Sequence, residues 1–149
     1  ISACGSLKSS SSSANLSITS AQYLNPNVYG KAAPVVVNIY QLKVPYAFMQ
    51  ASYSQLSENA AKTLGADLVD KTTIEVRPGS QMSLHQALTP NSHYIGITAD
   101  YRNIDQAKWR TMLKVNNTKG QNNPLAINLA SQTLTAKVGS SSNSFWSAL

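Results

Sequence analysis

The chain is poor in cysteine, because among its 149 residues only Cys4 carries a thiol. A single cysteine excludes an intrachain disulfide, so packing alone must hold the fold together. Long hydrophobic runs are also missing: no apolar stretch approaches the ~20 residues that a membrane-spanning helix needs. Any attachment to a membrane must therefore be covalent or go through a partner.

Charge is scarce as well. Charged residues make up 12% of the chain, well below the usual share of roughly a quarter. Twelve Lys and Arg against six Asp and Glu give a net charge of +6. The basic residues are scattered, and the only close set is Lys108, Arg110 and Lys114. No nucleic-acid-binding motif accompanies this set, so we interpret it as a solvated strand face and expect no nucleic-acid partner.

The motifs of common enzymes and metal sites are absent. The sequence has no G-x-S-x-G, no glycine-rich phosphate loop, no H-E-x-x-H and no paired-cysteine zinc pattern. His85 and His93 could meet across a hairpin, but no third metal ligand accompanies them. The six carboxylates show no spacing that indicates an acid–base pair. We therefore predict no enzymatic activity, no catalytic residue, no metal and no cofactor.

The chain opens with ISACGS, which places an aliphatic residue three positions before the cysteine with small residues between them. This resembles a bacterial lipobox, in which the cysteine becomes the first mature residue and its sulfur carries a diacylglycerol. The resemblance implies a lipid anchor on Cys4 and makes residues 1–3 a remnant of the signal peptide. Gly5 stands where an aspartate commonly signals inner-membrane retention, which favours the outer membrane. A free cysteine at a frayed terminus is the alternative.

Five consecutive serines, at positions 9–13, follow the cysteine closely. Such a stretch buries no apolar surface and is typical of a flexible linker. We predict a tether over residues 4–13 and a folded domain over residues 14–139. Residues 140–149, which contain the apolar stretch Phe145–Leu149, are predicted to form a C-terminal tail.

From residue 14 onward, hydrophobic residues recur with a period of two, which puts alternate side chains on one face of a strand. Leu68, Ile74 and Val76 share one face of such a segment, whereas Lys71 and Glu75 share the other. Seven or eight short segments of this kind are separated by Gly, Pro and Asn clusters. They predict an all-β fold, a two-sheet antiparallel β-sandwich.

Residues 46–64 depart from this alternation. Apolar residues there recur every four positions from 56 to 64, and Ser52 and Gln55 have the spacing of a capping box. Gly65 follows where a helix would end. We predict one or two short helices between the second and third strands, packed on an edge or end of the sandwich.

The connection before the second strand is long, from residue 20 to residue 34. It mixes apolar and aromatic side chains with turn-forming residues, in Tyr23, Leu24, Asn25, Pro26, Asn27, Val28, Tyr29, Gly30 and Lys31. Rigid aromatic groups on an ordered loop are typical of protein-binding hot spots. The alternative is that Tyr23 and Leu24 plug one end of the sandwich.

In their order along the chain, several segments are similar to the TssJ family, the outer-membrane lipoproteins of the bacterial type VI secretion system. They are the lipobox-like start, LNPN at 24–27, PVVVNIYQL at 34–42, the turn at 78–79, YIGI at 94–97, YR at 101–102 and WR at 109–110. The resemblance runs from Cys4 to about Val115. It implies a transthyretin-like β-sandwich with added helices and a structural, non-enzymatic role.

The resemblance also implies partners. Members of the family are held at the periplasmic face of the outer membrane by their lipid, which here would be on Cys4. They bind the periplasmic C-terminal region of the inner-membrane protein TssM, and through that complex they are joined indirectly to TssL. The family contacts TssM through the loop between the first two strands, which here is the stretch from Tyr23 to Lys31.

Two other classes of function stay open at this point. A transthyretin-like lipoprotein that binds a small ligand would need a sizeable apolar pocket with converging polar groups. A periplasmic hydrolase would need a cleft that holds a perturbed acid, base or nucleophile.

Overall fold

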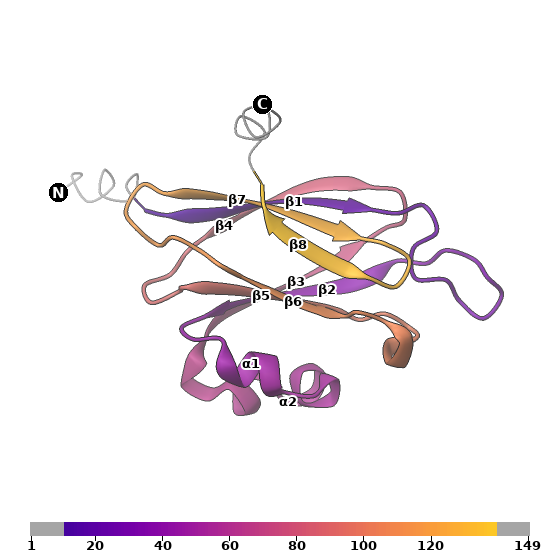
Figure 1. Ribbon diagram of the computed structural model, residues 1–149, viewed down its shortest axis with the longest axis horizontal. Coiled ribbons are helices and arrows are strands. Elements are labelled where there is room, and N and C mark those ends of the chain that lie inside the picture. The colour runs from indigo at the N-terminus through magenta and orange to yellow at the C-terminus, as the bar shows by residue number, and fades with distance from the viewer. Residues whose placement is uncertain (1–10, 140–149) are drawn as a thin grey trace.

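The computed structural model describes residues 11–139. In this range two four-stranded sheets pack face to face, and two helices cover the outside of one sheet (Figure 1). The strands are β1 (Ser13–Ser20), β2 (Val35–Leu42), β3 (Leu68–Val76), β4 (Gln81–Ala87), β5 (Tyr94–Ala99), β6 (Arg110–Lys114), β7 (Asn122–Leu129) and β8 (Leu134–Val138). The helices are α1 (Tyr46–Gln50) and α2 (Tyr53–Leu64). The predicted sandwich and the helical insertion between the second and third strands are both confirmed.

The strand order is β4-β1-β7-β8 in one sheet and β3-β2-β5-β6 in the other. Neighbouring strands are antiparallel except β1 and β7, which run parallel with Ser13 opposite Asn122 and Ser20 opposite Leu129. Parallel neighbours need a long crossover between them. Here the chain between β1 and β7 forms the whole second sheet and also β4, a connection that alternation along single strands could not indicate.

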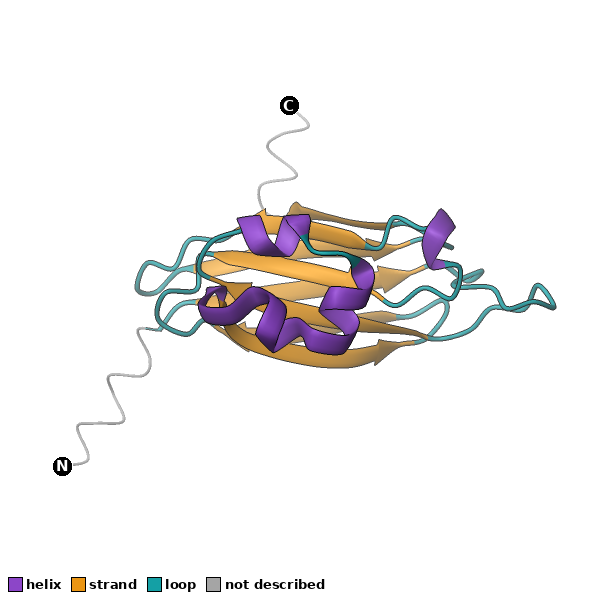
Figure 2. Cartoon of the chain, turned by 90° about the horizontal axis from the view of Figure 1, so that it is seen from below, coloured by secondary structure: helices purple, strands orange, loops and turns teal. Residues whose placement is uncertain are grey.

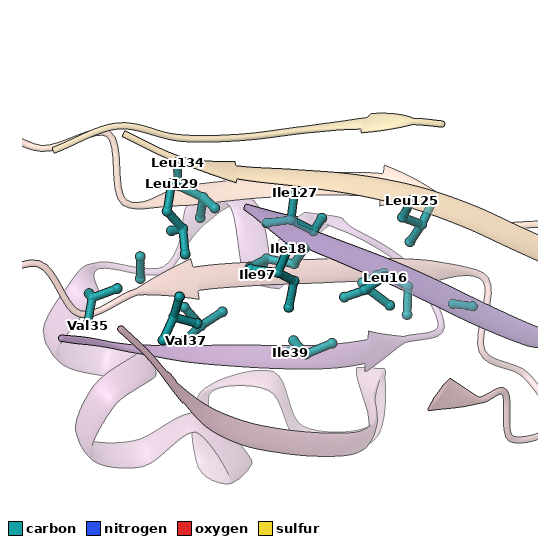
Figure 3. Packing of buried hydrophobic residues seen from close by; sticks show 14 of the residues in the cluster. Leu16, Ile18, Val35, Val37, Ile39, Ile97, Leu125, Ile127, Leu129 and Leu134 are labelled. Atoms are coloured by element: carbon teal, nitrogen blue, oxygen red, sulfur yellow. The ribbon is translucent and has the colours of Figure 1, made fainter. Parts of the chain in front are cut away.

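The main core fills the space between the two sheets. Its members are apolar residues of both sheets, and ten of them are labelled in Figure 3. The cluster consists of Ala14, Leu16, Ile18, Leu24, Val35, Val37, Ile39, Val76, Leu88, Ile95, Ile97, Ala99, Tyr101, Val115, Leu125, Ile127, Leu129 and Leu134. The described part of the chain has no disulfide. Removal of this apolar surface from water is therefore the main contribution that stabilises the fold.

A second, smaller core lies on the opposite face of β2, under the helices (Figure 2). Tyr40 and Leu42 of β2 are buried there against Phe48 of α1 and Leu56 and Leu64 of α2. Strand β2 is therefore buried on both faces. The helices were predicted on an edge or end of the sandwich; they lie instead on the outer face of a sheet, because that face carries its own apolar residues.

The local signals for α2 are confirmed in detail. The Ser52 side chain accepts from the Gln55 backbone N–H at 3.1 Å, and the Gln55 side chain accepts from the Ser52 backbone N–H at 2.8 Å. Gly65 follows as the C-cap at φ 55°. The helix is kinked at Asn59, whose φ of −142° and ψ of 49° are not helical.

The sandwich begins earlier than predicted. Ser13 is already paired with Ala87 and Asn122. Ser12 is 5% exposed, and its hydroxyl donates to the Asn117 side chain. Both serines were assigned to the tether because a serine run has no apolar pattern, but backbone pairing needs none.

Candidate functional site

The loop of residues 21–34 joins β1 to β2 and extends beyond the end of the sandwich (Figure 1). It is the predicted partner-binding loop. Its residues divide into a stem fastened to the sandwich and an exposed tip, and this division separates the nine predicted site residues.

Leu24 and Asn25 form the stem. The Leu24 side chain is fully buried in the main core, and its carbonyl accepts from the backbone N–H of Ala33 at 2.9 Å. The alternative prediction, that this part of the loop closes one end of the sandwich, is therefore correct for Leu24. Its side chain is not available to a partner. Pro26 and Asn27 are half-buried beside the stem.

Asn25 fastens three segments together. Its Oδ1 accepts from the backbone N–H of Arg102 at 2.8 Å, and its Nδ2 donates to the carbonyl of Pro34 at 2.9 Å. Its backbone N–H donates to the carbonyl of Ser131 at 2.9 Å. Asn25 is 7% exposed and has a φ of 48°, a left-handed conformation that asparagine tolerates better than most residues. It is a structural residue of the stem, not a contact residue.

Asn27 organises the tip. Its side-chain oxygen accepts from the backbone N–H groups of Tyr29 and Lys31, at 2.9 and 3.0 Å. Its carbonyl accepts from the N–H of Gly30 at 2.9 Å, and its own N–H donates to the carbonyl of Lys31 at 2.8 Å. Gly30 has a φ of 75°, which glycine adopts without strain. Four hydrogen bonds thus hold the tip in one shape.

The tip presents apolar side chains to solvent. Tyr29 is 84% exposed, Val28 is 69% exposed and Tyr23 is 53% exposed. The Tyr23 hydroxyl lies 3.5 Å from the position that a Cβ on Gly30 would take, so its ring lies along the loop. Lys31 is also exposed and adds a positive charge beside the aromatic pair.

The loop and the start of β1 lie at opposite ends of the sandwich (Figure 1). Strand β1 crosses the sheet from Ser13 to Ser20 without interruption, a rise of about 24 Å at the usual spacing of an extended strand. A chain entering at Ser12 therefore reaches the domain at the end remote from the tip. Cys4 itself lies outside the described residues, as do residues 1–3, most of the predicted tether and the C-terminal tail.

Arg110 was predicted to lie on a solvated face together with Lys108 and Lys114. Only the two lysines are exposed. The Arg110 guanidinium donates to the carbonyls of Phe48 and Ala51, at 2.9 and 2.5 Å, and lies 4.5 Å from the Trp109 ring centre. Burial lowers the pKa of Arg110. The side chain fastens α1 to β6, an arrangement that no spacing in the sequence indicates.

The candidate histidine pair does not form. His85 belongs to β4, where its Nδ1 lies 2.7 Å from the Asn15 side-chain oxygen of β1, whereas His93 precedes β5 in the other sheet. Residues 11–139 contain no group of three His, Cys, Asp or Glu side chains that could hold a metal ion.

The hollows of the described surface differ from the pocket that a ligand carrier would need. One of about 580 Å³ lies at the end of the sandwich where β1 begins and is lined mainly by polar residues, including His93, Lys114 and Asn116. Another, of about 440 Å³, lies on the outer face of the β1-β7-β8 region, lined by Ser17, Thr135 and neighbours. The space between the sheets is filled by the main core.

No helix within residues 11–139 is long and apolar enough to cross a membrane.

The groups in that range whose pKa clearly departs from its ordinary value are Tyr40, Tyr53, Tyr101 and Arg110, and burial is the largest cause for each. Each of the four packs within the fold.

Comparison with known proteins places this fold and loop in a family. The family model of the type VI secretion lipoproteins, described as T6SS-SciN with the names VasD, EvfM, TssJ and VC_A0113, matches residues 12–132. None of the curated proteins matches the chain.

Solved structures match over most of the chain. The crystal structure of the T6SS lipoprotein TssJ1 from Pseudomonas aeruginosa is 32% identical, with a TM-score of 0.81 over 88% of this chain and 98% of that chain. A chain in a structure described as the type VI membrane complex is 26% identical, with a TM-score of 0.74 over 84% of this chain and 97% of that chain.

A further match is to a chain in the structure described as T6SS protein TssM C-terminal domain (869-1107) from EAEC. It is 25% identical, with a TM-score of 0.70 over 85% of this chain and 98% of that chain. The family model spans strands β1 to β7 and the β1–β2 loop, and the TssJ1 structure matches 88% of the chain at 32% identity, so the chain belongs to the TssJ family of type VI secretion lipoproteins.

Proposed function

We propose that this protein is a lipid-anchored structural component of the type VI secretion membrane complex. Acylated Cys4 inserts into the outer membrane, and the domain stands at its periplasmic face. The tip of the β1–β2 loop binds the periplasmic C-terminal region of TssM, and TssL is joined indirectly through TssM. The protein has no catalytic role in this assembly.

The observation that carries the proposal is the contrast between the stem and the tip of the loop. Asn25 and Leu24 hold the stem, and Asn27 holds the tip, so that Val28 and Tyr29 are exposed on a backbone that is already ordered. An ordered aromatic group buries a large area on binding and loses little side-chain freedom. Such a tip can bind a protein without the entropic cost of first ordering the loop.

The geometry of the domain supports the same arrangement. Residues 4–11 would span at most about 28 Å when fully extended, and they join the sandwich at the end opposite the loop. An anchor on Cys4 would therefore direct the tip away from the outer membrane and toward a partner that reaches up from the inner membrane.

The structural matches support TssM as that partner. One similar chain belongs to a type VI membrane complex and another to a structure of the TssM C-terminal domain. The second match spans 85% of this chain and 98% of that one. The two chains are therefore of similar length. This supports the proposal that a protein of the same fold as this one occurs together with TssM in that structure.

The test is a binding measurement between the Cys4→Ser full chain and the periplasmic C-terminal region of TssM from the same organism. Replacing Val28 with Ser and Tyr29 with Ala should weaken binding by at least about 2 kcal/mol, roughly thirtyfold, as expected for a hot spot. Isothermal titration calorimetry gives the affinities, and the thermal midpoint should not change because both side chains are exposed.

The matched control is Tyr46→Ala, which removes a tyrosine that is 70% exposed at the other end of the sandwich. It should leave TssM binding unchanged. Loss of binding in both variants, or in neither, would show that the tip is not the interface. No binding by the intact chain would reject TssM as the partner.

A further inference from the structure

The exposed apolar residues of the described surface are concentrated at two places. Eight large hydrophobic side chains are exposed, and three of them belong to the β1–β2 loop. Three others fall within six residues of one another: Val44 is 39% exposed, Tyr46 is 70% exposed and Met49 is 44% exposed. Single exposed apolar residues need no explanation, but a local group indicates contact with something apolar. The TssM-binding loop does not include this second group.

This second group follows the last residue of β2, at the end of the sandwich where the chain enters. Leu42 is paired with Tyr94, the first residue of β5, and Ser13 is paired with Ala87, the last residue of β4. The N–H of His93, next to Tyr94, donates to the carbonyl of Leu42 at 2.9 Å. Val44 and Tyr46, which follow β2 within four residues, thus lie at the end of the domain that β1 enters. Figure 1 shows the β1–β2 loop at the opposite end.

The same end carries exposed lysines. Lys43 precedes Val44, Lys114 ends β6, and Lys119 lies in the β6–β7 loop; all three are exposed. Ser13 donates to the carbonyl of Gln121 in that loop at 2.9 Å, which holds the loop beside the entry point of the chain.

The neighbouring charges do not cancel these lysines. Asp67 directly precedes β3 at this end, and the start of β3 holds Asp70 and also Lys71, whose ammonium lies 5.5 Å from the Tyr40 ring centre. Four lysines against two carboxylates leave the end positive. The hollow of about 580 Å³, which is lined by Lys114, His93 and other polar residues, lies at the same end.

We propose that this end is a second membrane contact, in which Val44 and Tyr46 enter the headgroup region of the bilayer and Lys43, Lys114 and Lys119 face anionic phospholipids. It rests on the proposed anchoring of the domain through Cys4, which brings this end to the membrane. Tyrosine is favoured at the membrane–water interface, because its ring is apolar and its hydroxyl stays hydrated. A lysine near an anionic surface adds attraction that salt weakens.

The contact gives the lipid anchor a function that the acyl chains alone lack. Attachment through a single residue leaves the orientation of a domain free, whereas a second contact through its end holds the long axis upright. The TssM-binding tip would then point away from the bilayer in every copy.

The experiment measures co-sedimentation of the full-length Cys4→Ser protein with vesicles, so that no acyl chain contributes. We expect binding to equimolar phosphatidylglycerol and phosphatidylcholine, much weaker binding to phosphatidylcholine alone, and loss of binding at high salt. Changing Lys43, Lys114 and Lys119 together to Gln should lower the affinity by about fivefold per lysine, up to roughly a hundredfold. Tyr46→Ser should lower the affinity while leaving its salt dependence unchanged.

The matched control changes three exposed basic residues of the opposite end, Arg77, Arg102 and Lys108, to Gln. It removes the same charge and should reduce binding far less. An equal loss in both triple variants would show unspecific attraction and overturn the proposal. Absence of binding by the Cys4→Ser protein, or full binding by the lysine variant, would overturn it as well.

TssM binding is measured on the same proteins. The lysine variant should bind TssM normally, because its substitutions lie at the end remote from the tip. Failure of the proposed function would appear as lost TssM binding in the intact chain, whereas failure of this inference would appear only with vesicles.

Discussion

The side-chain oxygen of Asn25 accepts a hydrogen bond of 2.8 Å from the backbone N–H of Arg102, which joins two segments 77 residues apart in the chain. The same side chain donates to Pro34 at the other side of its own loop. The orientation of the exposed tip therefore depends on one asparagine that no partner could touch, since it is 7% exposed.

We predict that Asn25→Gly lowers the free energy of unfolding by about 1–3 kcal/mol, because it leaves a largely buried N–H and a carbonyl without partners. Glycine keeps the left-handed φ, so the loss reports the hydrogen bonds alone. Urea unfolding measures the loss, and an unchanged stability would show that the hydrogen bonds of the Asn25 side chain contribute little.

Leu24→Ala should destabilise the fold by about 2–5 kcal/mol, as expected for a leucine removed from a core, because Leu24 is fully buried. Val28→Ala, at a side chain that is 69% exposed, should change stability by less than about 0.5 kcal/mol. Chemical denaturation separates the two. A Leu24→Ala protein that keeps its stability but loses TssM affinity would contradict the assignment of Leu24 to the core.

Gly96→Ala should destabilise the second core. A Cβ on Gly96 would lie 2.7 to 2.9 Å from three atoms of the Phe48 ring, which is itself fully buried. Overpacking of this kind typically costs about 1–3 kcal/mol. In a double-mutant cycle with Phe48→Leu, the loss from Gly96→Ala should become smaller. An additive cycle would show that the ring moves aside freely.

Cys4→Ser should release the protein from isolated membranes after a high-salt wash, because durable anchoring requires acyl chains. The folded domain should be unaffected, since the sandwich begins at Ser12 and Ser13, eight residues or more after Cys4, and the thermal midpoint should match that of the acylated protein. Retention of the variant through the wash would show that another part of the protein anchors it.

The stability of the fold at high pH should depend on Tyr53. Burial, and after it the negative charge of Asp100, raise the pKa of Tyr53 from 10 to about 12. The folded state therefore disfavours ionisation. This contribution to stability is complete below pH 10 and is lost as the pH rises from 10 through about 12.

Tyr53→Phe keeps the edge-on contact with Trp109, whose ring centre lies 5.2 Å away, and removes the ionisable hydroxyl. The variant should therefore lose less stability than the parent between pH 10 and pH 12. Urea unfolding at several pH values measures the difference, in which the other tyrosines and the lysines cancel. Parallel curves for the two proteins would show that Tyr53 titrates normally.

Most elements of this fold were predictable because their signals are local. The alternation of Ile74 and Val76 with polar residues depends only on the pleat of a strand. Leu68 was predicted on the same face, but a register shift at the start of β3 turns it toward the second core instead. The capping box at the start of α2 involves only Ser52 and Gln55, which lie within four residues. The end of α2 at Gly65 is likewise set by a single local residue. The position of the long β1–β2 loop follows from the strands on either side of it.

The candidate site was predictable as a segment but not residue by residue. Leu24 and Tyr29 are both apolar residues in a turn-rich loop, and nothing local distinguishes them. The structure buries one completely and leaves the other 84% exposed, because the neighbouring Asn25 is bound to segments that lie far away in the chain.

The sequence by itself determined the strands, the capped helix, the helical insertion and the long loop, since each depends on contacts between residues a few positions apart. Only the tertiary structure decided the parallel pairing of β1 with β7, the placing of the helices on the outer face of a sheet, and the entry of Ser12 and Ser13 into the sandwich. It also decided which end of the domain carries which exposed group. The strand pairing and the entry of the serines depend on residues about a hundred positions apart, and the site of the helices depends on which face of the sheet the main core leaves free. Bringing distant residues together costs chain entropy and is stabilised only when both sheets and both cores form together.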